Sequence, residues 1–170
     1  MSPRSTEGKR DLAELDGMME EIVADAYGSQ NPEARCVDGN HCPSTGSAHM
    51  GQEGISHLLQ LWLEALETGD PRTVALLYES NSILLPTVSN QVRHNRQEIQ
   101  DYFVHFLAQE PKGTVQEENI RTYGQLAINS GVYTFAFSDG SWVQARFSFV
   151  YRWNGQQWMI VEHHSSRMPE

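Results

Sequence analysis

The second half of the sequence alternates between apolar and polar residues in a way that restricts it to a sheet. Segments after Pro111 are rich in β-branched and aromatic residues, and we expect strands over 114–123, 125–138, 141–153 and 157–166. Turn residues occur at Asn129-Ser130-Gly131, Asp139-Gly140 and Asn154-Gly155. Alternation with a period of two, interrupted by such turns, is typical of strands joined by hairpins. The pattern predicts an antiparallel meander.

The residues before this meander have the periodicity of helices. Apolar residues recur at helical spacing from Gly54 to Leu66, from Pro71 to Tyr78 and from Gln97 to Leu107. A short apolar run over 83–87 is broken by Pro86 and reads as a strand. Helices followed by an antiparallel meander indicate an α+β fold, with the helices packed on one face of a curved sheet. A sheet curled around a helix leaves a cone-shaped pocket, which is the expected place for a site.

Residues 1–53 are expected to stand apart from the folded unit, which we place at residues 54–170. A helix is predicted over 11–27, and residues 28–50 form a flexible extension rich in Gly, Pro, Asn and Ser. The residue types in it that bind metals are Cys36, His41, Cys42 and His49. Their spacing fits no compact zinc finger or ribbon. The two cysteines could equally form a local disulfide on oxidation, and the sequence leaves this open.

Composition excludes several classes of partner. A chain of 170 residues is about one domain, and its net charge of −10 with scattered Lys and Arg argues against nucleic-acid binding. No run approaches the roughly 18 apolar residues of a membrane span. The N-terminus lacks the apolar region of a secretory signal. We expect a cytoplasmic protein that does not bind membranes.

The last predicted strand carries two histidines and two serines in a row, at 163–166. Strand alternation places Val161, His163 and Ser165 on the pocket face, and His164 on the other face. The same alternation brings neighbouring strands' aromatic residues to the pocket face: Tyr133, Phe147 and Phe149. Because adjacent histidines on a strand point in opposite directions, His163 and His164 cannot bind one ion without a bulge. A tight catalytic metal site is therefore not favoured.

Several segments resemble the association domain of calcium/calmodulin-dependent protein kinase II, which belongs to the NTF2-like superfamily of cone-shaped α+β folds. They are the helix 58–66, the Leu84-Leu85-Pro86-Thr87 segment, the helix 101–107 and the segment 158–169. Within that superfamily, His163-His164-Ser165-Ser166-x-Met168-Pro169 is most similar to the iota class of carbonic anhydrases. Glu162 stands where some members carry a third histidine.

The resemblance implies a carbonate dehydratase, a lyase that reversibly hydrates CO2 to bicarbonate. The family's bicarbonate-contacting threonine and tyrosine match Thr87 and Tyr102, and the serine of its histidine-serine ending matches Ser165. Some members work without metal and others prefer manganese. We expect no cofactor, with manganese or zinc as the alternative.

Each of these residues has an expected role in the hydration of CO2. Apolar CO2 would lie against Tyr133, Phe147, Phe149 and Val161. Thr87 and Ser165 would position the water, and Tyr102 would donate to the developing negative charge. His163, with an expected pKa near 6.5, would accept the proton.

Two other functions remain open. One is a non-catalytic NTF2-like module for oligomerisation or ligand binding, since fold does not determine function. The other is a ketosteroid-isomerase-like or polyketide-cyclase-like enzyme, which needs an acidic base that the pocket-facing positions do not offer. A homodimer or higher homo-oligomer is expected under every one of these functions.

Overall fold

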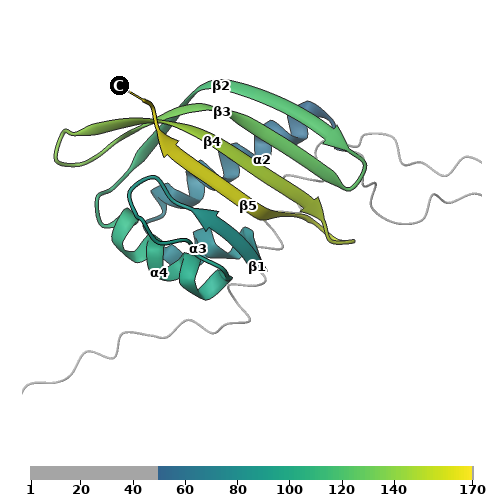
Figure 1. Ribbon diagram of the computed structural model, residues 1–170, viewed down its shortest axis with the longest axis horizontal. Coiled ribbons are helices and arrows are strands. Elements are labelled where there is room, and N and C mark those ends of the chain that lie inside the picture. Colours follow the sequence, from purple (N-terminus) through teal and green to yellow (C-terminus); the bar gives the residue numbers. More distant parts are fainter. Residues whose placement is uncertain (1–49, 170) are drawn as a thin grey trace, which may run out of the picture. The chain divides into compact units, whose positions relative to one another are not determined.

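The computed structural model describes residues 50–169, in which helices cover one face of a curved five-stranded sheet (Figure 1). The α+β architecture predicted from the sequence is confirmed. The elements in chain order are α2 (Gln52–Glu67), α3 (Pro71–Leu76), β1 (Tyr78–Leu85), α4 (Arg96–Leu107), β2 (Lys112–Tyr123), β3 (Leu126–Ala136), β4 (Trp142–Trp153) and β5 (Trp158–Arg167). Within these described residues, no helix is both long and apolar enough to cross a bilayer.

The helix expected from near Gly54 starts slightly earlier, because α2 begins at Gln52. The predicted helix over 11–27 and the extension over 28–50, with Cys36 and Cys42, lie almost entirely outside the described residues.

Strand order in the sheet is β1-β5-β4-β3-β2. The meander from β2 to β5 is antiparallel throughout, as the alternation predicts. The first strand, β1, pairs in parallel with β5, so β5 lies inside the sheet with neighbours on both sides. This arrangement brings the end of β1 beside the histidines and serines of β5, with Leu84 opposite His163.

β1 begins earlier than the sequence indicates. Tyr78 was expected to continue the helix from Pro71, but α3 ends at Leu76 and Tyr78 opens the strand. The start of the strand is held by a residue of another element, because Arg96 of α4 donates two hydrogen bonds to the Tyr78 carbonyl oxygen, at 2.9 and 2.7 Å. Local periodicity does not reveal such a contact.

The predicted turn at Asn129-Ser130-Gly131 is wrong, since these residues lie within β3. The chain turns instead at Gly124, whose φ of 61° suits glycine. Gly131 is required for a different reason, which is lack of space: a Cβ built on it would lie 1.8 Å from the Glu117 carbonyl oxygen on β2. Glycine therefore permits a close approach between the two strands here, next to an irregularity in their pairing.

Aromatic side chains fill the space between α2, α4 and the inner face of the sheet. Trp62 of α2 is at the centre and is 2% exposed. Its ring stacks parallel to Tyr133, with 6.2 Å between centroids, and meets Phe149 edge-on at 5.2 Å. Aromatic pairs in these geometries add to the stability given by burial alone. The core therefore holds the inner face of β3 to β5 rigidly against α2, which lies behind the sheet in Figure 1.

Candidate functional site

A small cavity lies between the inner face of the sheet, α4 and the segment that follows β1. Its polar lining consists of Thr87, Tyr102, Tyr133, His163 and Ser165, and the rest is apolar, with Trp62, Leu84 and Phe103 among the lining residues. Its volume is about 20 Å³. On the same scale one water molecule needs roughly 10–15 Å³, so the cavity suits a ligand of very few atoms.

The structure brings together all four residues predicted to be catalytic. Thr87 follows the proline that ends β1, Tyr102 comes from α4, and His163 and Ser165 come from β5. The hydroxyls of Thr87 and Ser165 are hydrogen-bonded to each other, although the two residues lie 78 positions apart in the chain. Tyr133, predicted to line the pocket, does so as well.

The other predicted pocket residues lie elsewhere. Phe147 and Phe149 are buried in the core but do not line the cavity, whereas Tyr133 and His163, which they contact, do. Phe149 supports the His163 ring from behind, stacked at 3.9 Å between centroids and 18° between planes. Phe147 packs similarly on Tyr133, at 4.8 Å.

Val161 is not on the pocket face at all. Val150 of β4 pairs with Glu162, whereas the next residue, Tyr151, pairs with Ile160, so Val161 is an extra residue in a β-bulge. Ile160 takes the buried position instead and is 2% exposed. Simple alternation along β5 is therefore correct from 163 onward and fails before the bulge.

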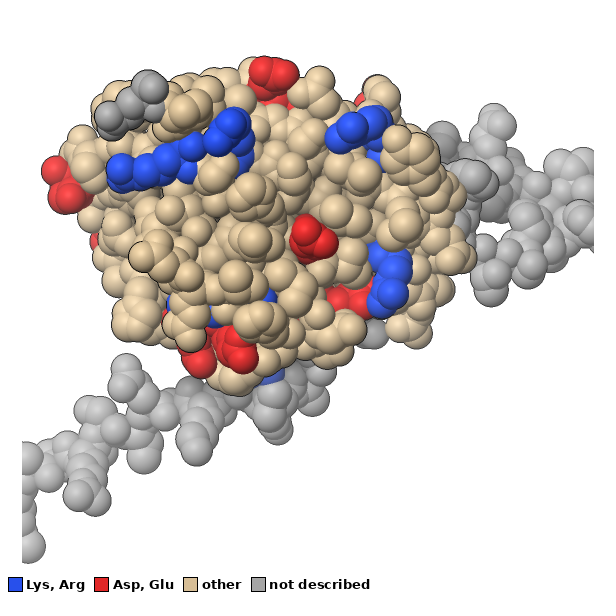
Figure 2. Space-filling view, in the orientation of Figure 1, with Lys and Arg blue, Asp and Glu red and all other residues tan. Residues whose placement is uncertain are grey.

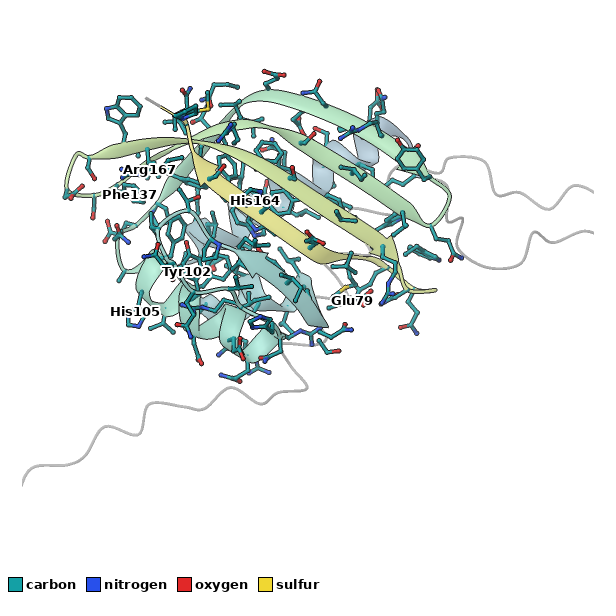
Figure 3. All side chains as sticks on the ribbon, viewed as in Figure 1. Glu79, Tyr102, His105, Phe137, His164 and Arg167 are labelled. Atoms are coloured by element: carbon teal, nitrogen blue, oxygen red, sulfur yellow. The ribbon has the colours of Figure 1, made fainter. Side chains whose placement is uncertain are left out.

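Alternation does place the two histidines correctly. His163 is 2% exposed and points inward, whereas His164 is exposed. In Figure 3, His164 lies on β5, and Tyr102 lies between α4 and the sheet. The two rings cannot share a ligand in this geometry.

His163 does not have the near-neutral pKa expected from the sequence. Burial disfavours the charged ring, and His164 beside it adds electrostatic repulsion, so the pKa of His163 falls to about 3. The ring is therefore neutral at physiological pH. It can orient other groups by hydrogen bonding, but it does not take up a second proton at this pH.

Both ring nitrogens of His163 face tyrosine hydroxyls. Nδ1 lies 2.8 Å from the hydroxyl of Tyr78, and Nε2 lies 3.4 Å from that of Tyr133. The Tyr78 hydroxyl in turn accepts a hydrogen bond from the indole nitrogen of Trp62, at 3.0 Å. This inner part of the hydrogen-bond chain lies entirely in the core.

From His163 the chain continues to the hydroxyls that line the cavity. The Tyr133 hydroxyl donates to Ser165 Oγ at 2.6 Å, and Ser165 is bonded to Thr87. Burial raises the pKa of the Tyr133 hydroxyl, so it stays protonated and remains a donor. One continuous chain of hydrogen bonds thus runs from the core to a half-buried hydroxyl, that of Thr87, at the cavity.

Trp62 and Tyr78 are the members of this chain that sequence reasoning missed. In the sequence pattern, Trp62 is one more apolar residue of an amphipathic helix, and Tyr78 falls at the end of the next predicted helix. The only available signal was that a buried indole or phenol needs a hydrogen-bond partner. That rule says a partner exists but does not say which residue it is.

Tyr102 completes the polar lining from the opposite side. It is 8% exposed, and burial raises the pKa of its hydroxyl, so the hydroxyl stays protonated. The Arg93 guanidinium lies 5.9 Å from the centroid of its ring and partly opposes that rise. Tyr102 can therefore donate a hydrogen bond into the cavity beside a positive charge.

The donors around this cavity do not fit a manganese or zinc ion. Across residues 50–169, no three His, Cys, Asp or Glu side chains lie close enough together to hold a metal. At the cavity, His163 is the one residue among the polar lining with a nitrogen ligand, and both its nitrogens face tyrosine hydroxyls. Hydroxyl groups form the rest of the polar lining, and neutral hydroxyls are weak ligands for these ions.

A curved sheet closed by helices around a hydroxyl-lined cavity defines a cone of the NTF2-like class. Solved NTF2-like structures share the fold: a Pseudomonas putida protein of unknown function has a TM-score of 0.62 at 14% identity, covering 70% of this chain and 87% of that one. An NTF2-like family protein from Streptomyces avermitilis has a TM-score of 0.63 at 16% identity, covering 69% and 96%. These matches support the fold alone.

The chain belongs to the calcium/calmodulin dependent protein kinase II association domain family, which matches residues 51–169. A crystal structure from Xanthomonas campestris described as such a domain is 41% identical, with a TM-score of 0.67. The match covers 79% of this chain and 99% of that one. None of the curated proteins matches the sequence.

Proposed function

We propose that this protein is a carbonic anhydrase of the iota class, which hydrates CO2 to bicarbonate without a metal ion. The observation that carries the proposal is the set of linked hydroxyls, Thr87, Ser165 and Tyr133, at a cavity of about 20 Å³. Thr87 and Ser165 of this set, together with Tyr102 in the same lining, are the residues that the resemblance to that class matches to its bicarbonate contacts. The size of the cavity supports a substrate as small as CO2 over the steroid or polyketide substrates of other cone-shaped enzymes.

The apolar walls suit CO2, and the hydroxyls suit water and bicarbonate. Trp62, Leu84 and Phe103 offer a surface that does not compete with CO2 for hydrogen bonds. The hydroxyls of Thr87 and Ser165 hold the attacking water, and Tyr102 donates to the oxygen on which negative charge develops. Donors that are already in place at that oxygen stabilise the transition state without reorganising.

In the reaction, the water oxygen bonds to the carbon of CO2, and one O–H bond of the water breaks. The products are bicarbonate and a proton. Buried His163, with a pKa near 3, is too weak a base to keep that proton at neutral pH. The proton therefore passes to solvent at the mouth of the cavity, where Val88 is 45% exposed. His163 acts as a neutral positioning residue in this scheme, and no longer as the proton acceptor expected from the sequence.

The test is stopped-flow CO2 hydration by the full-length protein in metal-free buffer with a chelator, repeated with added manganese or zinc. Turnover should survive the chelator. Thr87→Ala and Ser165→Ala should each lower kcat/KM by about tenfold or more, as expected when a group that orients the reacting water is lost. His164→Ala is the matched control from the same strand, because His164 is exposed on the other face. Turnover only with added metal, or near-normal rates in both cavity variants, would contradict the proposal.

We also propose that the protein is a homodimer or higher homo-oligomer, as the association-domain family suggests. The outer face of the sheet supports this, because Figure 2 shows only scattered charged residues on it. Trp142 of β4 is 69% exposed. Sedimentation analysis of the full chain tests the assembly, and a monomer at micromolar concentration would exclude it. Absence of CO2 turnover in an oligomer would leave an association module as the better function.

A further inference from the structure

We propose that Trp62 and Tyr78 fix the direction of the whole hydrogen-bond chain, so that Thr87 presents its hydroxyl hydrogen to the cavity. The cavity is then set to bind a hydrogen-bond acceptor, such as an oxygen of a small oxyanion, in preference to a donor. This deepens the proposed function, because it assigns a positioning role to two residues that are not among the cavity's hydroxyl groups. It rests on the proposed function where bicarbonate is named as the ligand.

The direction starts at Trp62, because an indole N–H can only donate. It donates to the Tyr78 hydroxyl oxygen at 3.0 Å, which leaves the Tyr78 hydrogen to find an acceptor. Tyr78 is 0% exposed, so water does not provide one. The acceptor within reach is His163 Nδ1, at 2.8 Å.

This assignment selects one of the two neutral forms of His163. If Nδ1 carried the hydrogen, the Tyr78 oxygen would face two donors and its own hydrogen would remain buried without an acceptor. Such a group is strongly disfavoured in a protein interior. The ring must therefore carry its hydrogen on Nε2, which donates toward the Tyr133 hydroxyl oxygen at 3.4 Å.

The remaining steps follow in the same direction. Tyr133 donates to Ser165 Oγ at 2.6 Å, so the Ser165 hydrogen is free to be donated to Thr87 Oγ1. Thr87 then accepts from Ser165, and its own hydrogen points to the cavity that it lines. Each donor strengthens the next through polarisation, so the last hydroxyl is a better donor than an isolated threonine.

Tyr78→Phe breaks the chain four hydrogen bonds before Thr87, at a residue that does not line the cavity. Tyr151→Phe is the matched control, since Tyr151 is likewise buried, at 1% exposed, on the inner face and its hydroxyl has no hydrogen-bond partner in the described structure. Both variants remove one buried phenol oxygen, but only Tyr78→Phe frees Nδ1 of His163.

The primary measurement is the 15N spectrum of His163, which distinguishes a protonated from an unprotonated ring nitrogen. The wild-type protein should show hydrogen on Nε2 and none on Nδ1. Tyr78→Phe should shift His163 toward a mixture of the two neutral forms, and Tyr151→Phe should leave it unchanged. Hydrogen on Nδ1 in the wild-type protein would overturn the inference without any variant being needed.

The second measurement is bicarbonate binding, followed by 13C relaxation or amide shifts in the full-length protein at constant pH. Tyr78→Phe should weaken the affinity by about fivefold, the loss typical of one well-oriented hydrogen bond. Tyr151→Phe should leave the affinity within about twofold of wild type. An unchanged affinity in Tyr78→Phe, with the ring form also unchanged, would contradict the inference.

The experiments distinguish failure of the proposed CO2 hydration from failure of the proposed hydrogen-bond direction. Neither the His163 spectrum nor bicarbonate binding requires turnover. Absence of CO2 hydration with the expected ring form would refute the catalytic function and leave a directed acceptor site. Normal turnover with the opposite ring form would refute the direction alone.

Discussion

Replacing His163 with glutamine should change how the stability of the fold depends on pH. In the unfolded chain this imidazole binds a proton below its ordinary pKa of about 6.5. In the folded protein it does not do so until the pH approaches 3, because the ring is buried. Between these two values the unfolded state binds more protons than the folded state, so stability decreases as the pH decreases.

The size of the effect follows from the two pKa values. Each pH unit between them removes about 1.4 kcal/mol from the free energy of unfolding. Near pH 7.5 the contribution is close to zero, and near pH 5 it reaches roughly 2 kcal/mol. Carboxylates have not begun to titrate strongly over most of this window, and the exposed histidines are present in both proteins.

Urea unfolding at fixed protein concentration, followed by fluorescence at several values between about pH 5 and about pH 7.5, measures this difference. His163→Gln will be less stable than wild type at neutral pH, since the core loses a well-packed ring. Its loss of stability on acidification should nevertheless be smaller than that of the wild-type protein by about 2 kcal/mol. His164→Gln, on the exposed face, should retain the wild-type slope. Equal slopes in wild type and His163→Gln would refute the claim that the buried ring is neutral.

Two further substitutions test how the scaffold around the cavity is held. Gly131→Ala should destabilise the fold by about 1–3 kcal/mol in urea unfolding, because the added Cβ would meet the Glu117 backbone at 1.8 Å and β2 would have to move. Asn95→Ala should cost about 1 kcal/mol in the same assay, because the Asn95 side chain caps α4 by accepting from the Glu98 amide at 2.9 Å. A stable Gly131→Ala protein would show that the two strands can separate without loss, and an unaffected Asn95→Ala protein would show that packing alone holds α4.

The parts of the fold that sequence reasoning predicted are those whose signal is local. Amphipathic periodicity located α2 and α4, and alternation located the meander and put His163 inward. The missed parts depend on distant residues. Tyr78 was assigned to a helix, but its hydroxyl is bonded to Trp62 and His163, which are 16 and 85 positions away in the chain. The bulge at Val161 is visible only in the register between β4 and β5.

The cavity residues divide in the same way. His163 and Ser165 followed from alternation, whereas Thr87 and Tyr102 were assigned through a family resemblance, because nothing in their local sequence marks them. The near-neutral pKa expected for His163 was wrong, since the surrounding aromatic rings that exclude water come from α2, β1 and β4. Sequence position alone does not give the degree of desolvation on which a pKa depends.

The interior position of β5 has a consequence for how the protein folds. Without β5, β1 and β4 have no strand between them, so each presents an unpaired edge. Unpaired edges are templates for pairing with other chains, and long-range strand pairing is slow to form. The chain is therefore most exposed to aggregation in any state in which β5 has not yet docked between β1 and β4. Because β5 also supplies His163 and Ser165, the cavity acquires its hydrogen-bond chain in the same step that closes the sheet.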